Sequence, residues 1–415
     1  MSPLTDRDGT LWIEGMPLAD IATRHGTPCF VYSRAALEAA YREFDGAFAA
    51  IPHLTCYALK ANSNLAVLDV FARLGSGFDV VSGGELARVI AAGGDPRKVV
   101  FSGVGKTGAE LTRGLELGIR CFNVESGSEL AHLDRIAGRL GKRAPVSLRV
   151  NPDVDPQTHP YIATGLKQSK FGVAFEEALP LYRRAAGLAN IVVRGIDIHI
   201  GSQITALEPY REAATKVLEL VDTLAAEGIR LEHVDLGGGI GILYRDETPL
   251  VLAEYAAMIG ELFRGRRESL LFEPGRLLTG NAGVLLTRVT YLKPGPEHSF
   301  AVVDAAMNDL LRPALYGAWH DVRPVRPRND NRPRLWQIVG PVCESADFLA
   351  RDRELSLAEG DLLAVLSAGA YAMAMSSNYN SRPRAAEVLV DGAAMHLVGR
   401  RESVGELFAR ESRLP

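Results

Sequence analysis

The stretch Tyr57-Ala58-Leu59-Lys60-Ala61-Asn62 places a lysine at the end of an apolar run, Leu54 to Leu59, that is typical of a buried strand. A buried ammonium group is costly unless it is paired or neutralised. A free lysine keeps its proton up to a pKa near ~10.4, but a lysine that condenses with an aldehyde loses that charge. Lys60 is therefore either a nucleophile that forms a Schiff base or a lysine whose ammonium reaches solvent at a domain rim.

Short β-type runs alternate with helical patterns on both sides of this lysine, from about residue 28 to 280. The eight runs are Cys56–Leu59, Phe78–Val81, Val99–Phe101, Cys121–Val124, Val146–Val150, Gly195–Ile200, His233–Leu236 and Leu270–Glu273. Such alternation predicts a parallel sheet with right-handed crossovers. Eight units predict a (β/α)8 barrel, and a doubly wound sheet is the alternative.

Polar and glycine residues come at the ends of several of these runs, which favours the barrel. They are Lys60, Asp79, His199, Gly237–Gly239 and Glu273–Arg276. In a (β/α)8 barrel the carboxyl ends of all strands meet on one face, and active sites lie there. The sequence therefore predicts one pocket built from residues more than 200 positions apart.

The pattern changes after about residue 281, where β-type runs follow one another without long helices. These runs are Val284–Tyr291, Phe300–Val303, Leu335–Val339, Leu362–Leu366 and Glu387–Val390. Asp391-Gly392 is a typical hairpin turn, Thr10–Ile13 is expected to join the same sheet, and Val322–Arg334 is expected to be an exposed loop. We therefore expect a barrel domain at 28–280 and a β-sandwich or barrel-like domain formed by 1–27 plus 281–415.

Composition excludes several classes of protein. The 415 residues are 47% hydrophobic and 23% charged, which is typical of a globular protein with an ample core. The net charge of -4 gives no footprint for nucleic acid or an anionic membrane. No apolar run is long enough to span a bilayer, and the N-terminus lacks a signal-peptide pattern. Four dispersed cysteines without CxxC spacing indicate a reducing, cytoplasmic setting.

Each remaining motif has a structural and a functional interpretation. Gly237-Gly238-Gly239-Ile240-Gly241 is either a turn or a place where backbone N–H groups approach a phosphate. Glu273 either caps the barrel through a salt bridge or holds the protonated ring nitrogen of a pyridine cofactor. His199 is either a core histidine or a flat ring that stacks on a cofactor. Since no second histidine lies at metal-ligand spacing from it, we predict no metal site.

Two further motifs are weaker. Gly105-Lys106-Thr107 resembles the end of a P-loop, but Val100 stands where the motif requires its first glycine. Cys343, next to Glu344, is either a buried inert thiol or a proton donor, since a free thiol has a pKa near ~8.5.

Taken together, the motifs resemble the fold-type III decarboxylases that depend on pyridoxal 5'-phosphate (PLP), and most closely the diaminopimelate decarboxylase family, which makes L-lysine from meso-diaminopimelate. The resemblance covers about Thr27 to Met395. The motifs are Tyr57–Asn62, Asp79–Glu85, His199–Ile204, Gly237–Gly241, Glu273–Arg276, Arg312–Tyr316, Cys343–Ser345 and Gly369–Tyr371. We find no motif position at which the chain departs from the family pattern.

The resemblance implies a role for each of these residues. The implied catalytic residues are Lys60, which forms the Schiff base, His199, which stacks on the ring, and Cys343, which protonates the carbanion. The implied cofactor contacts are Lys60, Asp79, His199, Ser202, Gly237, Gly238, Gly239, Glu273, Pro274, Gly275, Arg276 and Tyr371. The implied substrate contacts are Arg276, Arg312, Tyr316, Glu344 and Tyr371.

The resemblance also implies a homodimer in which Cys343 and Glu344 reach the site of the partner subunit. An arginine for the distal carboxylate and an acid for the distal ammonium suit diaminopimelate, because a guanidinium matches a carboxylate in two hydrogen bonds. The alternatives are a decarboxylase of ornithine, arginine, carboxynorspermidine or a modified diaminopimelate-like substrate, a racemase of the alanine racemase type, and a non-catalytic binding protein on the same scaffold.

Overall fold

The computed structural model describes residues 3–155, 170–328 and 332–415. Contacts between residues divide the chain into two compact units, whose boundary falls inside helix α2 (Arg34–Ala47). The barrel unit consists of Ala40–Ile242 and Thr248–Leu277, and the β unit of Met1–Ala39, Leu243–Glu247 and Leu278–Pro415. Among the described helices, none combines the length and apolar character that crossing a bilayer requires.

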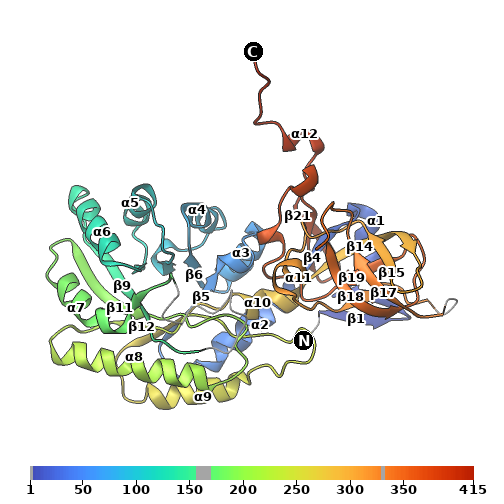
Figure 1. Cartoon of the computed structure of the whole chain (residues 1–415). Coiled ribbons are helices and arrows are strands. Elements are labelled where there is room, and N and C mark those ends of the chain that lie inside the picture. Colours follow the sequence, from blue (N-terminus) through green and yellow to red (C-terminus); the bar gives the residue numbers. More distant parts are fainter. Residues whose placement is uncertain (1–2, 156–169, 329–331) are drawn as a thin grey trace. The chain divides into compact units, whose positions relative to one another are not determined.

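The barrel unit is a closed ring of eight parallel strands surrounded by helices (Figure 1). The strands are β5 (His53–Ala58), β6 (Gly77–Val80), β7 (Val99–Phe101), β8 (Cys121–Val124), β9 (Ala144–Asn151), β11 (Ile191–Asp197), β12 (His233–Asp235) and β13 (Ser269–Phe272). The ring closes because β13 pairs with β5, and β8 pairs with both β7 and β9. Short β10 (Val173–Ala174) extends the pairing from β9. The predicted (β/α)8 barrel is confirmed.

Helices follow the strands in sequence, as the alternation predicts. They are α3 (Leu65–Arg73), α4 (Gly83–Ala91), α5 (Gly108–Leu117), α6 (Gly127–Arg139), α7 (Phe175–Ala186), α8 (Glu208–Ala226) and α9 (Leu252–Leu262). Three of them begin at a serine or threonine whose hydroxyl accepts the backbone N–H of a glutamate three residues later: Ser82 with Glu85, Thr107 with Glu110 and Ser126 with Glu129. This capping satisfies an otherwise unpaired N–H group and starts each helix close to the carboxyl end of a strand.

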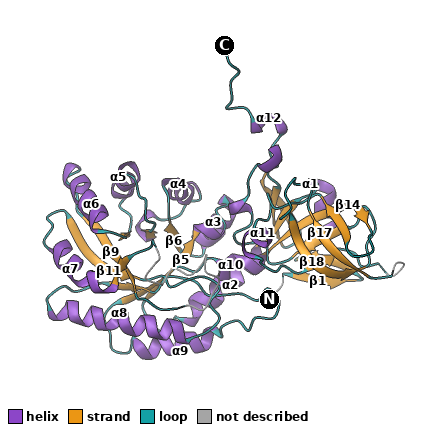
Figure 2. Cartoon of the chain, in the orientation of Figure 1, coloured by secondary structure: helices purple, strands orange, loops and turns teal. Residues whose placement is uncertain are grey.

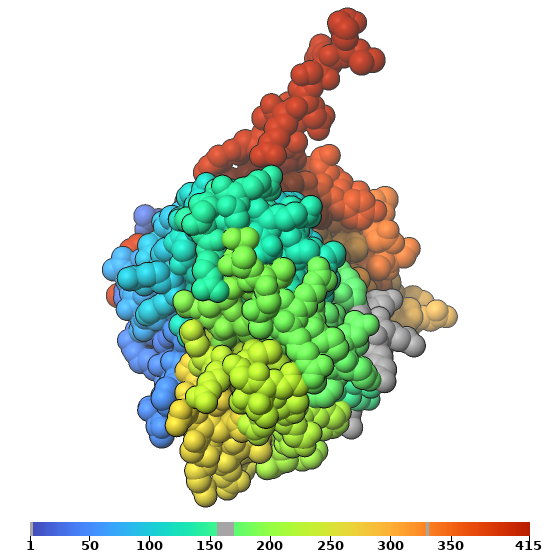
Figure 3. All heavy atoms as spheres, turned by 90° about the vertical axis from the view of Figure 1, so that its left-hand side faces the viewer, coloured from blue at the N-terminus to red at the C-terminus, as the bar shows by residue number. Residues whose placement is uncertain are grey.

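Apolar side chains fill the barrel and the layer beneath its helices. Inside the ring, Cys56, Val100, Cys121 and Leu271 form a buried cluster, so two of the four cysteines act as small core residues. Between the strands and α9, Phe48 packs on Phe272 with ring centroids 4.2 Å apart. Figure 3 shows the face of this unit formed by the segments from α5 to α9, in cyan, green and yellow.

The β unit is dominated by strands, with only short helices such as α1 (Leu18–His25) and α11 (Arg312–Tyr316) (Figure 2). Its main sheet has the order β18-β17-β15-β14-β4-β20-β21, and β16 and β19 pair beside it. The strands are β4 (Cys29–Ser33), β14 (Gly283–Lys293), β15 (Ser299–Val303), β16 (Val322–Pro324), β17 (Arg334–Val339), β18 (Phe348–Leu355), β19 (Leu362–Val365), β20 (Ala386–Asp391) and β21 (Ala394–Gly399). Three N-terminal strands, β1 (Leu4–Arg7), β2 (Thr10–Ile13) and β3 (Met16–Pro17), form a separate small sheet.

Several expectations about this unit are confirmed. All five predicted runs form strands, and Asp391-Gly392 turns the chain between β20 and β21, with Gly392 in the left-handed region at φ 59°. Leu11 and Ile13 of β2 share one buried core with residues of β4 and β14. The N-terminal strand therefore belongs to the all-β unit, as predicted.

One expectation is wrong. The segment Val322–Arg334 is not simply an exposed loop, because its first three residues form β16 and pair with β19. Val322 is buried there, and Val325 is buried in the core that holds Leu11. Residues 329–331 of this segment lie outside the described part of the chain. The exact domain boundaries, 28–280 and 1–27 plus 281–415, stay a prediction.

Candidate active site

Lys60 and Asp79 form the ion pair around which the barrel site is built. Lys60 lies in a turn directly after β5, and Asp79 lies on the neighbouring strand β6, opposite Ala58. The Nζ atom of Lys60 donates to Oδ2 of Asp79 over 2.9 Å. The Lys60 side chain is 29% exposed and that of Asp79 is fully buried. The lysine therefore has a fixed partner inside the barrel and an open side from which a reactant can reach it.

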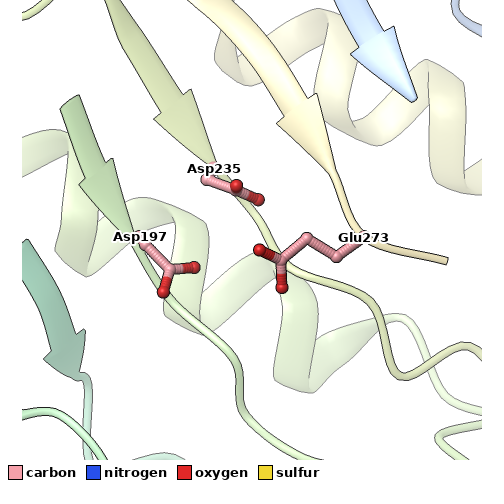
Figure 4. A group of neighbouring side chains, drawn as sticks. All are labelled: Asp197, Asp235 and Glu273. Carbon is pink, nitrogen blue, oxygen red and sulfur yellow. The ribbon is translucent and has the colours of Figure 1, made fainter. Parts of the chain in front are cut away.

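Three carboxyl groups meet at the ends of three neighbouring strands (Figure 4). Asp197 ends β11, Asp235 ends β12, and Glu273 follows β13. Asp197 and Asp235 are direct neighbours in the sheet register, and one oxygen from each of the three groups lies within 4.8 Å of the others. We call these residues the carboxyl triad.

Burial and mutual repulsion determine the protonation of the carboxyl triad. Both raise the pKa of Glu273 and of Asp197 well above the ordinary range, burial being the larger cause. Burial also raises the pKa of Asp235 to about 7, although this carboxylate accepts the backbone N–H of Gly237 over 2.9 Å. Within the described residues, no hydrogen-bonding group reaches either oxygen of Asp197. The triad therefore has a strong affinity for positive charge, whether a proton or the cationic nitrogen of a ligand.

Glu273 has the contacts of an orienting carboxylate. Its Oε1 atom accepts weak hydrogen bonds from Ser102 over 3.4 Å and from Asn123 over 3.3 Å. Both partners lie on the inner side of the barrel, Ser102 directly after β7 and Asn123 in β8. A carboxylate held in this way can accept a hydrogen bond from a protonated ring nitrogen.

His199 lies two residues after the end of β11. Burial is the main cause that holds the pKa of its imidazole well below the usual value, and the charges of Lys60 and Arg149 lower it further. The ring is therefore neutral at physiological pH. A neutral, flat imidazole at a barrel strand end is suited to stacking on an aromatic ligand.

The glycine run after β12 is a close approach of backbone segments that excludes any side chain. A Cβ atom on Gly237 would lie 2.4 Å from the carbonyl oxygen of Ile198, and one on Gly238 would lie 2.1 Å from that of Glu273. A Cβ on Gly239 would lie 2.3 Å from the carbonyl oxygen of Gly201. These distances explain why three consecutive glycines are needed, since only glycine lets the backbone pass so closely.

Arg276 and Ser202 are brought together beside this run. Arg276 begins the short helix α10 (Arg276–Thr279), is buried, and donates from Nη2 to the hydroxyl of Ser202 over 3.0 Å. Gly275 precedes it at another close approach, where a Cβ atom would lie 3.0 Å from Cβ of Ala61. The carbonyl oxygen of Pro274 accepts the backbone N–H of Ala58 over 3.1 Å and so ties this turn to β5. A buried guanidinium, a hydroxyl and glycine backbone are the groups that bind a phosphate.

The other predicted residues lie in the β unit. Arg312 begins α11 and is buried, with its guanidinium 4.4 Å from the ring centre of Tyr244. Its Nη1 atom lies 2.8 Å from Nε2 of His320, whose Nδ1 atom lies 2.8 Å from the carbonyl oxygen of Leu366. Since Arg312 can only donate, His320 accepts at Nε2 and donates from Nδ1. Tyr316 ends the same helix and is half-buried.

Cys343, Glu344 and Tyr371 lie in loops of the β unit. Cys343 is exposed, contrary to the interpretation as a buried inert thiol, and its backbone N–H donates to Asn380 over 2.7 Å. Glu344 is exposed and lies 3.5 Å from the hydroxyl of Tyr379. Tyr371 adopts φ 53°, in the left-handed region that non-glycine residues seldom occupy. Such strain is maintained by the surrounding structure and is often found at functional positions.

The analysis of the sequence missed four inward-facing polar residues: Ser102, Asn123, Asp197 and Asp235. The last two end their strands in the same way as Asp79 does, so the rule that selected Asp79 could have found them. Asn123 is a lone amide inside the apolar strand Cys121–Val124, which is also a recognisable signal. Lys106 is not a phosphate ligand, since its buried ammonium donates to Glu129 over 2.8 Å and to two carbonyl oxygens.

The barrel residues fit PLP in chemical type. They supply an amine for its aldehyde in Lys60, a carboxylate for its ring nitrogen in Glu273, a flat neutral ring in His199, and a cradle for its phosphate. The carboxyl triad adds the observation that carries the fit: it needs positive charge, and a protonated pyridine nitrogen provides it. A divalent metal there would instead compete with that nitrogen for Glu273.

Comparison with known families defines the class. A family described as "Pyridoxal-dependent decarboxylase, pyridoxal binding domain" matches residues 34–280, more than half of the chain. The chain therefore belongs to the pyridoxal-dependent decarboxylases.

Curated relatives narrow this class, because several carry one name over the whole length. The chain is 62% identical over 415 residues to diaminopimelate decarboxylase of Pseudomonas aeruginosa, covering 100% of both chains. It is 58% identical to diaminopimelate decarboxylase of Vibrio cholerae, covering 98% of both.

Solved structures agree with this result. Diaminopimelate decarboxylase of Helicobacter pylori, complexed with L-lysine, has a TM-score of 0.92 at 41% identity and covers 95% of this chain and 99% of its own. The enzyme of M. jannaschii in complex with L-lysine has a TM-score of 0.94 at 38% identity, covering 99% and 98%. A lysine decarboxylase mutant (SrLDC) in complex with PLP is more distant, with a TM-score of 0.82 at 25% identity, covering 94% and 96%.

Proposed function

We propose that the chain decarboxylates meso-2,6-diaminopimelate to L-lysine and CO2, the step that completes lysine biosynthesis. The observation that carries this proposal is the full-length match to diaminopimelate decarboxylases at up to 62% identity. The chain is accordingly a carbon–carbon lyase. The exposed Lys60 face and the glycine cradle of the barrel unit support the same activity on chemical grounds.

We infer that the cofactor is PLP. When bound, PLP supplies an electron sink that accepts the electron pair released as CO2 departs. Lys60 would hold it covalently, and Asp79 keeps the amine of Lys60 in place at 2.9 Å. Glu273 would accept a hydrogen bond from the ring nitrogen, and His199 would lie against the ring. The phosphate would be held by Ser202, Gly237 to Gly239, and the turn Pro274-Gly275-Arg276.

We assign substrate recognition to charged residues of both units. Arg276, Arg312 and Tyr316 would bind the distal carboxylate of diaminopimelate, and Glu344 would bind its distal ammonium. His320 supports this assignment for Arg312, because it fixes one edge of the guanidinium at 2.8 Å and leaves the remaining donors for a carboxylate. Tyr371 would contact both cofactor and substrate. A substrate without the distal carboxylate would leave these cations uncompensated, which disfavours ornithine and arginine.

We assign Cys343 to protonation of the carbon from which CO2 departs. Its exposure supports this role, because a proton donor must be accessible to the substrate. The assignment assumes a homodimer in which Cys343 and Glu344 serve the site of the partner subunit. The homodimer and the cytoplasmic location remain predictions.

A product assay tests the function. Purified protein with added PLP would be incubated with meso-diaminopimelate, and lysine and CO2 would be quantified, with ornithine, arginine and carboxynorspermidine as controls. Lysine and CO2 from diaminopimelate alone would support the proposal. Turnover of a control substrate in preference to diaminopimelate would replace it with the corresponding decarboxylase.

A further inference from the structure

The β unit contains a second cluster of positive charge, which has no role in the proposed reaction. A pocket of about 440 Å³ opens between α11, the segment after it and strand β18. This volume lies within the usual range for small-molecule sites. Three arginines line the pocket, Arg245, Arg351 and Arg353, against a single carboxylate, that of Asp352. We call it the arginine pocket.

The position of Arg353 is unusual for a cation. Its side chain is buried, with the residue only 7% exposed, and its guanidinium lies 3.1 Å from the ring centre of Trp319. Its Nη groups donate only to the backbone carbonyl oxygens of Arg351 and His320, over 2.5 and 3.0 Å. Its Nε atom is buried and has no hydrogen-bond partner among the described residues. A buried charge without a counterion is costly, so this guanidinium lacks the anion that normally accompanies it.

The neighbouring cations add to this deficit of negative charge. The guanidinium of Arg245 also lies over Trp319, 4.5 Å from the ring centre, and that of Arg351 lies 3.4 Å from the ring centre of Phe348. Within the described part of the chain, no ion pair includes either side chain. Burial, together with repulsion from Arg245, lowers the pKa of Arg353 to about 10.

The one carboxylate of the pocket does not neutralise these charges. Asp352 accepts the side-chain amide of Gln337 over 2.6 Å, and no arginine is within ion-pair distance of it in the described residues. A purely structural role would need one cation stacked on each ring, whereas two guanidinium groups share Trp319. The excess charge therefore points to a ligand.

We propose that the arginine pocket binds a small dianion that carries oxygen acceptors, a phosphate or a dicarboxylate. Planar guanidinium groups match both in pairs of hydrogen bonds. Arg245 and Arg351 are exposed at the rim and would close on the ligand from either side, and Arg353 supplies the fixed charge at the base. Binding would weaken as ionic strength rises, because the two rim arginines are accessible to salt.

The test is isothermal titration calorimetry on the dimer or monomer as purified, with PLP at saturation so that the phosphate cradle of the barrel is filled. Inorganic phosphate and succinate are titrated separately at low salt, and the tighter ligand identifies the source of the oxyanion. The variant R245Q/R351Q should reduce the affinity at least about tenfold. The matched control R400Q removes one exposed arginine that pairs with Glu406 far along the chain, and it should bind as the wild type does.

A second readout reports on the pocket itself. Anion binding should change the tryptophan fluorescence of the wild type, and W319F should lose this change. The absence of saturable binding of both anions would overturn the proposal, as would equal affinities in R245Q/R351Q and the wild type. A change of oligomeric state in R245Q/R351Q, measured by light scattering, without anion binding in the wild type, would instead identify a second copy of the chain as the occupant.

Discussion

Replacement of Asp235 by asparagine should remove most of the pH dependence that the carboxyl triad imposes on the stability of the cofactor-free protein. The pKa of Asp235 rises from 3.8 to about 7 on folding, mainly because the carboxyl group is buried. The folded state therefore binds this proton more tightly than the unfolded state does. Stability is complete below pH 3.8 and falls as pH rises towards 7.

The magnitude follows from the size of the shift. Each pKa unit corresponds to about 1.4 kcal/mol, so three units correspond to roughly 4 kcal/mol lost between pH 4 and pH 7. Asparagine does not titrate, and its carbonyl oxygen can still accept the N–H of Gly237. D235N should therefore equal the wild type near pH 4 and exceed it by up to about 4 kcal/mol at pH 7.

The assay is urea unfolding of the barrel unit at a series of pH values, with D134N as the control. Asp134 is half-buried on α6 and accepts N–H groups of Asn190, so its substitution changes the same chemical group outside the triad. Parallel pH profiles for D235N and the wild type would refute the reasoning. With PLP bound the difference should shrink, because the ring nitrogen would then supply the compensating charge.

The other predictions concern the proposed reaction. K60A should lose the visible absorbance of covalently bound PLP, and an unchanged spectrum would contradict the assignment of Lys60. G238A should lower PLP affinity at least about tenfold, because its Cβ would meet the carbonyl oxygen of Glu273 at 2.1 Å and shift the cradle; equilibrium dialysis measures this, and an unchanged affinity would contradict it. C343A should reduce kcat at least about a hundredfold with PLP affinity within threefold, because it removes the proton donor; near-normal turnover in a steady-state assay would exclude that role. R312A should raise KM for diaminopimelate at least about tenfold, because it removes a charged carboxylate partner; an unchanged KM would place the distal carboxylate elsewhere.

The barrel was predictable because the polar residues interrupt apolar runs at one consistent place. Lys60 and Glu273 each follow a run of apolar residues, and the parallel arrangement brings such strand ends to one face. Asp197 and Asp235 escaped notice because each was counted as part of its strand. Their importance arises only when the register places them side by side, and register between strands 38 positions apart is not visible in either strand alone.

The β unit was less predictable, for physical reasons that individual strands illustrate. In Phe348–Leu355 the arginines and aspartate hide the strand pattern, because their guanidinium groups stack on aromatic rings instead of extending into solvent. Val322–Pro324 has three residues and a proline, too short a pattern to distinguish from a loop. Cys29–Ser33 is visibly apolar, but its periodicity carries no information about which sheet will receive it.

That last strand has a consequence for the order in which the chain can fold during synthesis. All five residues of β4 are buried, and the strand lies between β14 and β20, pairing antiparallel with the first and parallel with the second. The ribosome makes β4 first and its partners after the whole barrel, which takes on the order of tens of seconds at ~5–20 residues per second. During that interval the segment Cys-Phe-Val-Tyr-Ser offers two unpaired edges to any other strand. We therefore expect nascent chains that stall before β20 to depend on chaperones, while the barrel behind them can already be folded.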